Sequence, residues 1–101
     1  MRTILIFDLP TLTKKNLKNY RVFVKSLKKL GFYMIQESVY VKMNLNQQIA
    51  DSTLNKIKQI SPSEGSIMLL TITEKQFSSM KIILGSVETD VITSDERTIK
   101  L

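Results

Sequence analysis

The sequence predicts an α+β domain whose strands and helices follow one another in the order β-α-β-β-α-β. Two segments, over about residues 13–30 and 47–60, carry apolar residues at the 3.6-residue spacing of a helix. Short runs of β-branched and aromatic residues precede, separate and follow these segments. The chain has 101 residues, which is enough for one compact domain and too few for two.

The first strand is expected over Thr3–Phe7, a run of β-branched and apolar residues. Asp8-Leu9-Pro10 closes this strand, because proline stops strand pairing and the residue before it stays extended. Thr13 suits the N-cap of a helix that runs to about Leu30. Gly31 then stands where a C-cap glycine belongs.

Residues 32–43 form either two strands joined near Gln36–Ser38 or one long bent strand, since twelve residues exceed the usual strand length. A second amphipathic helix follows over about residues 47–60. The residues expected on its apolar side are Ile49, Leu54, Ile57 and Ile60.

After the turn cluster at residues 61–65, the next strand is expected over residues 66–73. Thr73 and Gln76 fit a capping box that begins a short helix to about Met80. A short strand over Lys81–Leu84 would then end at Gly85, and two weaker strand candidates lie around residues 91–92 and 98–101.

This order of elements is that of the ferredoxin-like fold, in which one antiparallel sheet carries both helices on one face. Residues 1–85 are expected to form that domain, and residues 86–101 an extra C-terminal strand or tail. The open face of the sheet needs a cover. A second copy of the chain is the simplest one, so we expect a homodimer packed sheet to sheet.

The chain contains neither histidine nor cysteine. This excludes catalytic triads based on histidine, histidine general bases, thiolate zinc sites and disulfides. Any catalysis must use carboxylates, a hard cation such as Mg²⁺, or Lys, Ser and Tyr side chains. No segment approaches the roughly 20 apolar residues of a membrane helix, and no signal peptide is recognisable, so we expect a cytoplasmic protein without a membrane partner.

The net charge is +6, and the first 36 residues hold one acid against eight Lys or Arg. On the first predicted helix the cations share a wedge of roughly 100° opposite the apolar side. The candidate nucleic-acid contacts among them are Lys14, Lys18, Arg21, Lys25 and Lys28. Such a surface suits phosphate binding, although a solvated helix face is the ordinary alternative. Arg21 could also orient a carboxylate.

Asp8 is the one acid of this basic half and stands at the carboxyl end of the first strand. It is either a divalent-metal ligand and catalytic carboxylate or the residue that caps the turn before Pro10. One carboxylate makes a poor Mg²⁺ site. A twofold axis close to Asp8 would supply a second.

Several segments, in this order and spacing over residues 1 to about 85, resemble the small CRISPR-associated adaptation protein family in its type II variant. They are Ile4–Pro10, Tyr20–Phe23, Gly31-Phe32, Gln36–Tyr40 and Leu69–Phe77. The family is catalogued as CRISPR-associated endoribonucleases. The resemblance implies a homodimer, Asp8 as a magnesium ligand near the dimer axis, and a C-terminal strand within residues 91–101 that joins the partner's sheet.

The resemblance further implies a dimer that bridges the CRISPR integrase and holds duplex prespacer DNA without reading its sequence. This structural role is the function we predict. A magnesium-dependent endonuclease that acts on RNA or DNA through two Asp8 carboxylates is a second possibility. The alternative is a ferredoxin-like RNA-binding or toxin-like ribonuclease module unrelated to adaptation, which would need aromatic residues on an exposed sheet face.

Overall fold

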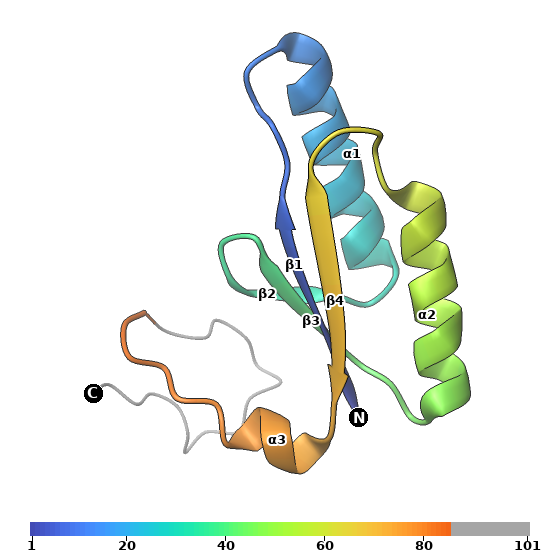
Figure 1. Cartoon of the computed structure of the whole chain (residues 1–101), viewed down its shortest axis with the longest axis vertical. Helices are drawn as coiled ribbons and strands as arrows, with labels where there is room; N and C mark the ends of the chain where they lie inside the picture. The colour runs from blue at the N-terminus through green and yellow to red at the C-terminus, as the bar shows by residue number, and fades with distance from the viewer. Residues whose placement is uncertain (86–101) are drawn as a thin grey trace.

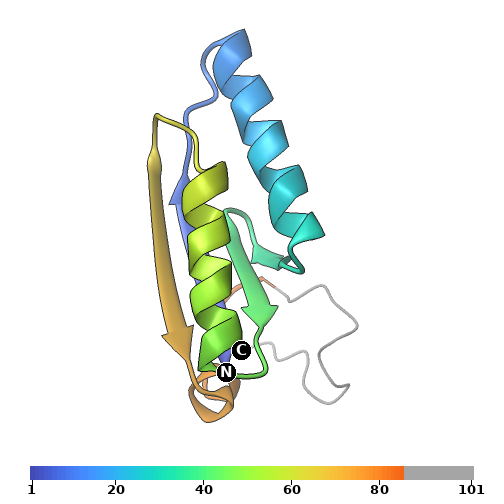
Figure 2. The same cartoon turned by 90° about the vertical axis from the view of Figure 1, so that its right-hand side faces the viewer.

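The computed structural model describes residues 1–85 as a four-stranded sheet with two long helices on one face (Figures 1 and 2). The elements in chain order are β1 (Arg2–Asp8), α1 (Lys14–Lys29), β2 (Tyr33–Gln36), β3 (Val39–Met43), α2 (Gln47–Ile60), β4 (Ser66–Ile72) and α3 (Glu74–Ser78). The strand order is β2-β3-β1-β4 and every neighbouring pair is antiparallel. The predicted ferredoxin-like α+β fold is therefore confirmed, with two strands over residues 32–43.

The central strand β1 divides the molecule into two faces, because successive side chains of a strand point to opposite sides. Thr3, Leu5 and Phe7 are buried and face the helices. Leu5 and Phe7 belong to the main core, which also contains Phe23 and Leu27 of α1. Ile6 and Asp8 lie on the other face of β1 and are exposed. The open face thus carries the candidate carboxylate.

Local capping signals begin and end the helices as expected. The Thr13 hydroxyl accepts a hydrogen bond of 3.0 Å from the backbone N–H of Asn16, and Gly31 has the positive φ of 103° that suits a C-cap glycine. The capping box is present too, since the backbone N–H groups of Thr73 and Gln76 each donate to the other's side chain.

Two expectations from the sequence are wrong. Ile49 is 40% exposed, and the buried stripe of α2 runs instead through Ala50, Thr53 and Ile57. Residues 81–84 form no strand, because within residues 1–85 their backbone joins no ladder of hydrogen bonds. A side-chain bond of 3.1 Å from Gln36 to the Leu84 carbonyl is their recorded polar contact.

The strand candidates at residues 91–92 and 98–101 lie outside the described residues, and so does the predicted tail. Among the helices of residues 1–85, none is long and apolar enough to cross a membrane.

Candidate nucleic-acid interface

The cationic surface of α1 follows from the helical repeat of its sequence. Phe23 and Leu27 are buried against the sheet, which turns the opposite side of the helix to solvent. Five side chains predicted to contact nucleic acid are all exposed on α1: Lys14, Lys18, Arg21, Lys25 and Lys28. We call these five residues the α1 cationic surface.

None of these five cations has a carboxylate partner in the part of the chain that the structure describes. The ion pairs recorded there join Glu74 to Arg2 and to the N-terminal ammonium group. The first turn of α1 contains no acidic residue, so the positive end of the helix dipole adds to the lysine charges. The surface therefore carries five exposed positive charges on one helix and suits an anionic partner.

An open groove of about 280 Å³ runs along one side of this surface. Tyr20 and Val24 are partly buried and pack against the main core, while Arg21, Lys25 and Lys28 supply the cations of the lining. The cations of this lining were predicted from the sequence, but Tyr20 was not. The signal was present, because Tyr20 and Val24 are one helical turn apart and directly precede Arg21 and Lys25.

Asp8 ends β1 on the open face of the sheet, opposite Ser66 of β4. Gly65 permits a close approach of the two chain segments there. A Cβ at Gly65 would lie 2.6 Å from Leu9 Cδ2 and 2.9 Å from the Asp8 carbonyl oxygen, and the φ of Gly65 is 107°. Among residues 1–85, the ion pairs join Glu74 to Arg2 and to the N-terminal ammonium group, and none joins Asp8 to Arg21.

The described residues contain no group of three or more His, Cys, Asp or Glu that could hold a metal ion, so Asp8 does not belong to such a cluster within one subunit. An Mg²⁺ site usually combines one or two carboxylates with phosphate oxygens and waters. One subunit therefore fits Mg²⁺ only when a substrate phosphate or a second copy supplies further oxygen ligands.

Exposed apolar side chains lie beside Asp8 on the open face. Ile6 of β1 pairs with Met68 of β4, and Ile4 pairs with Leu70. Met68 and Leu70 are 62% and 59% exposed, which is unusual for neighbouring large apolar residues of one sheet. We call Ile6, Met68 and Leu70 the sheet-face patch.

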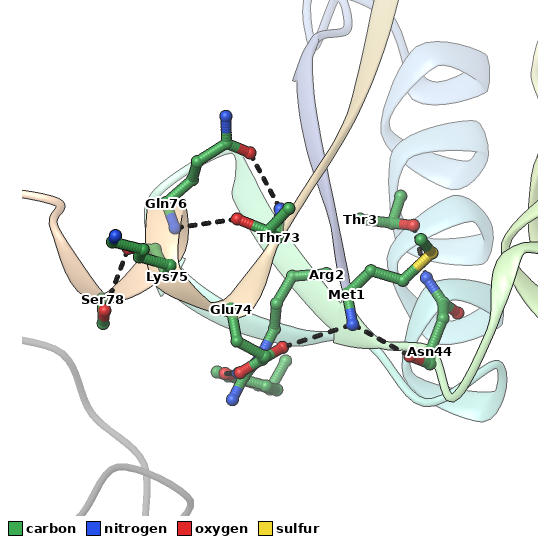
Figure 3. Close-up of polar contacts among 10 residues, drawn as sticks. Met1, Arg2, Thr3, Asn44, Thr73, Glu74, Lys75, Gln76 and Ser78 are labelled. Carbon is green, nitrogen blue, oxygen red and sulfur yellow. Dashed lines mark hydrogen bonds and ion pairs between the residues drawn. The ribbon is translucent and has the colours of Figure 1, made fainter.

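Arg2 begins β1 at the opposite end of the same face and is buried. Figure 3 shows it beside Glu74. Its Nε donates to both carboxylate oxygens of Glu74 at 3.1 and 2.9 Å, and its Nη1 donates to the Tyr33 hydroxyl at 2.7 Å. The guanidinium carbon lies 4.4 Å from the centre of the Phe77 ring. We call Arg2, Tyr33, Glu74 and Phe77 the Arg2 cluster.

The pKa values in this cluster are shifted by their neighbours. The hydrogen bond from Arg2 is the main cause that lowers the pKa of Glu74 below its usual value. Burial raises the pKa of Tyr33, against the opposing effect of the Arg2 charge. Sequence analysis did not find this cluster, because its members are up to 75 residues apart in the chain.

Asn44 forms a second polar network at the same end of the sheet (Figure 3). Its Nδ2 donates to Thr3 Oγ1 at 2.6 Å, and its Oδ1 accepts from Lys42 Nζ at 3.0 Å and Thr53 Oγ1 at 3.3 Å. Its backbone N–H donates to the Met1 carbonyl at 2.8 Å. Burial, followed by the charge of Lys56, lowers the pKa of Lys42.

Comparison with known proteins gives a consistent result. Residues 1–80 match the family described as "CRISPR associated protein Cas2". The CRISPR-associated endoribonuclease Cas2 of Treponema denticola is 46% identical over 101 residues, and the one of Ligilactobacillus salivarius is 45% identical, each with 100% of both chains covered. The Streptococcus mutans protein of the same name is 44% identical over 100% of this chain and 93% of its own.

A solved structure has the same fold. The crystal structure of Streptococcus pyogenes Cas2 superposes with a TM-score of 0.63 at 21% sequence identity, covering 84% of this chain and 100% of that chain. The three relatives are named endoribonucleases, which is consistent with the endonuclease activity expected from the sequence.

Proposed function

This chain belongs to the CRISPR-associated Cas2 family, and we propose that it acts in spacer acquisition as a homodimer that holds duplex prespacer DNA and bridges the CRISPR integrase. Family membership gives the chain a CRISPR-associated role. It supports this proposal over the alternative of a ferredoxin-like RNA-binding or toxin-like ribonuclease module unrelated to adaptation. The aromatic side chains support the same view, since Tyr40 is buried in the main core and Tyr33 is bonded to Arg2.

The observation that carries the proposal is the α1 cationic surface, whose five side chains are exposed and lack carboxylate partners within residues 1–85. Each cation that contacts a DNA phosphate releases condensed counterions, which gives affinity without sequence preference. Such contacts hold a duplex along its backbone and leave base edges unread. A protein that binds prespacers of any sequence requires such binding without sequence preference.

The test replaces three residues of this surface with glutamate, as Lys14→Glu, Lys18→Glu and Lys25→Glu together. Retention of duplex DNA should fall at least about 100-fold near 0.1 M salt, because three phosphate contacts become repulsive, and the slope of log affinity against log salt should fall by roughly 3. Fluorescence anisotropy across a salt series measures both quantities.

The matched control changes three exposed lysines elsewhere, as Lys56→Glu, Lys58→Glu and Lys75→Glu. Its net charge equals that of the first variant, so it reports the effect of overall charge alone. An equal loss of affinity in both variants, or unchanged binding by the α1 variant, would contradict the proposal.

The sheet-face patch supports the homodimer, because two copies that meet there would cover Ile6, Met68 and Leu70 from water. Such a dimer would present one α1 cationic surface on each side and so could flank a long duplex. The two equivalent sides would also offer two docking places for the integrase. Within residues 1–85, β4 is an edge strand in the order β2-β3-β1-β4, which supports addition of the partner's residues 86–101 to the sheet.

A metal-dependent endonuclease remains the second candidate, and the position of Asp8 favours it. Asp8 is exposed on the face that carries the sheet-face patch, so a twofold axis through that face would bring the carboxylates of both subunits toward each other. Asp8 and the partner subunit's Asp8 would then hold the ion. Mg²⁺ bound there supplies positive charge for phosphodiester hydrolysis.

Replacement of this carboxylate separates the two roles. The Asp8→Ala variant should lose magnesium-dependent cleavage of RNA and DNA by more than about 100-fold while it keeps its dimer and its duplex affinity. Asp51→Ala, an exposed carboxylate of α2, serves as the control. Gel assays with and without chelator measure cleavage, and sedimentation measures the dimer. Persistent cleavage by Asp8→Ala, or in excess chelator, would refute the nuclease assignment.

A further inference from the structure

The geometry of the groove on α1 leads us to infer a binding site for an unpaired nucleotide, in which the base stacks on Tyr20 and the neighbouring cations hold the phosphates. This inference rests on the proposed binding of nucleic acid by α1 and extends it to single-stranded segments. In this inference Tyr20 contacts a base, whereas the α1 cationic surface contacts only the phosphate backbone of the nucleic acid.

Tyr20 is held in place before any ligand binds. Its ring meets the Phe7 ring edge to face, with centroids 5.8 Å apart and an interplanar angle of 61°. Phe7 is itself fixed in the main core. The part of Tyr20 that lines the groove is therefore a preorganised apolar surface, and Val24 extends it by one helical turn.

The cations of the groove have the spacing of successive helical turns. Arg21 and Lys25 are about 6 Å apart along the helix axis, and Lys28 follows one turn later. Within the described chain, no acid neutralises these three groups. An occupant must therefore combine at least one negative charge with an apolar or aromatic surface.

A paired duplex meets only half of this requirement. Its phosphates can contact the cations, but its bases are stacked on each other and leave the Tyr20 and Val24 surface uncovered. An unpaired nucleotide offers both a phosphate and a flat base. Proteins that bind single strands use this combination of cations and an aromatic platform. The groove is open and holds about 280 Å³, so it would contact a nucleotide from one side.

The first test needs no substitution. An oligothymidylate and an abasic oligomer of the same length carry equal charge and differ in the bases. The full chain should bind the oligothymidylate roughly tenfold more tightly, because a base stacked on an aromatic ring adds to the affinity. Equal affinities would overturn the inference. If duplex binding is present at the same time, the proposed function stands while this inference falls.

Two variants of Tyr20 then locate the stacking surface. Tyr20→Phe keeps the ring and should keep the tenfold preference for the base-bearing oligomer, whereas Tyr20→Leu fills similar core volume without a ring and should reduce the ratio to about one. Thermal unfolding of both variants shows whether the core is intact. A retained preference in a folded Tyr20→Leu variant would contradict the assignment.

A third probe distinguishes nucleic acid from a protein ligand, because an acidic peptide with apolar residues could also combine charge and apolar surface. A glutamate- and leucine-containing peptide with the charge of the oligothymidylate should compete at least tenfold less well for the site. Equal competition would overturn the inference in favour of a protein partner.

Discussion

The Arg2 cluster and the α1 cationic surface show two different uses of positive charge in one small chain. The Arg2 side chain is 9% exposed and contacts a carboxylate, a phenol hydroxyl and an aromatic ring. The five α1 cations are exposed, and within residues 1–85 none has an acidic partner. The comparison shows how two kinds of cation differ. A buried cation that is paired with a carboxylate stabilises the fold, whereas an exposed cation without such a partner is available to a ligand.

The physical reason lies in desolvation. A buried guanidinium is tolerated only when hydrogen bonds and an opposite charge replace its water, so removal of a partner destabilises the protein. An exposed lysine keeps its water, and its replacement changes stability by about 0.5 kcal/mol or less. The comparison therefore predicts that substitutions at the Arg2 end of the sheet lower stability, whereas those on α1 lower affinity for nucleic acid.

The largest effect on stability is expected from Asn44→Ala, next to the Arg2 cluster. Asn44 is almost fully buried, and its removal leaves the Thr3 and Thr53 hydroxyls without their partner. The free energy of unfolding should fall by roughly 2–3 kcal/mol, which corresponds to a decrease in Tm on the order of 10 °C. Urea and thermal unfolding measure the change.

The control for this substitution is Asn55→Ala, on the exposed side of α2, which should change stability by less than about 0.5 kcal/mol. Equal stabilities for Asn44→Ala and the wild-type chain would break the comparison, because the polar network would then contribute nothing to the fold.

The same substitution, arginine to methionine, tests the comparison at both sites with a smaller expected change in stability. Arg2→Met removes the charge from the Arg2 cluster, leaves the Tyr33 hydroxyl without its partner and leaves Glu74 with the N-terminal ammonium group alone, so stability should fall by about 1–2 kcal/mol. Arg21→Met makes the same change on α1. Its stability should stay within about 0.5 kcal/mol, while its affinity for duplex DNA falls several-fold. The opposite pattern, with Arg21→Met the less stable variant, would contradict our interpretation.

The parts of the fold that could be predicted from sequence are those that local interactions determine. Thr13, Gly31 and the Thr73 capping box act within four residues of their partners, so the helix limits were correct to within about two residues. The predicted strand at residues 81–84 failed because a strand exists only beside another strand, and composition does not reveal whether one is available. The prediction that Ile49 lies on the apolar side of α2 was wrong for a similar reason, because side-chain burial depends on how α2 packs against the sheet.

In the candidate site too, features set by local geometry were predictable from the sequence, and features set by long-range packing were not. The α1 cations were predictable because helical geometry alone places them on one side. The Arg2–Glu74 pair was not, because it joins the first strand to α3 across 72 residues. The groove beside Tyr20 depends on how α1 packs on Phe7, which the sequence pattern does not specify. The role of Asp8 is still a prediction, since it depends on a second subunit.

The smallest effect concerns Glu74, whose side chain is 51% exposed although it pairs with buried Arg2. Hydrogen bonding to Arg2 lowers the pKa of Glu74 in the folded chain below the ordinary 4.5. The ionised carboxylate therefore stabilises the fold at neutral pH, and this contribution disappears as the pH falls from about 5 through the lowered pKa. Because water screens the exposed carboxylate, Glu74→Gln should cost less than about 1 kcal/mol near pH 7.

The difference in stability between the wild-type chain and Glu74→Gln should shrink toward zero as the pH falls through the lowered pKa of Glu74, as measured by urea unfolding across the acid range. Glu64→Gln is the matched control, because Glu64 is exposed and accepts a hydrogen bond from Asn16 without an ion pair in the described residues. The pH dependence seen with Glu74→Gln is judged against this variant, which carries the same substitution away from Arg2. A Glu74→Gln difference that persists or grows on acidification would mean that packing of α3, rather than the ionised carboxylate, holds Arg2 in place.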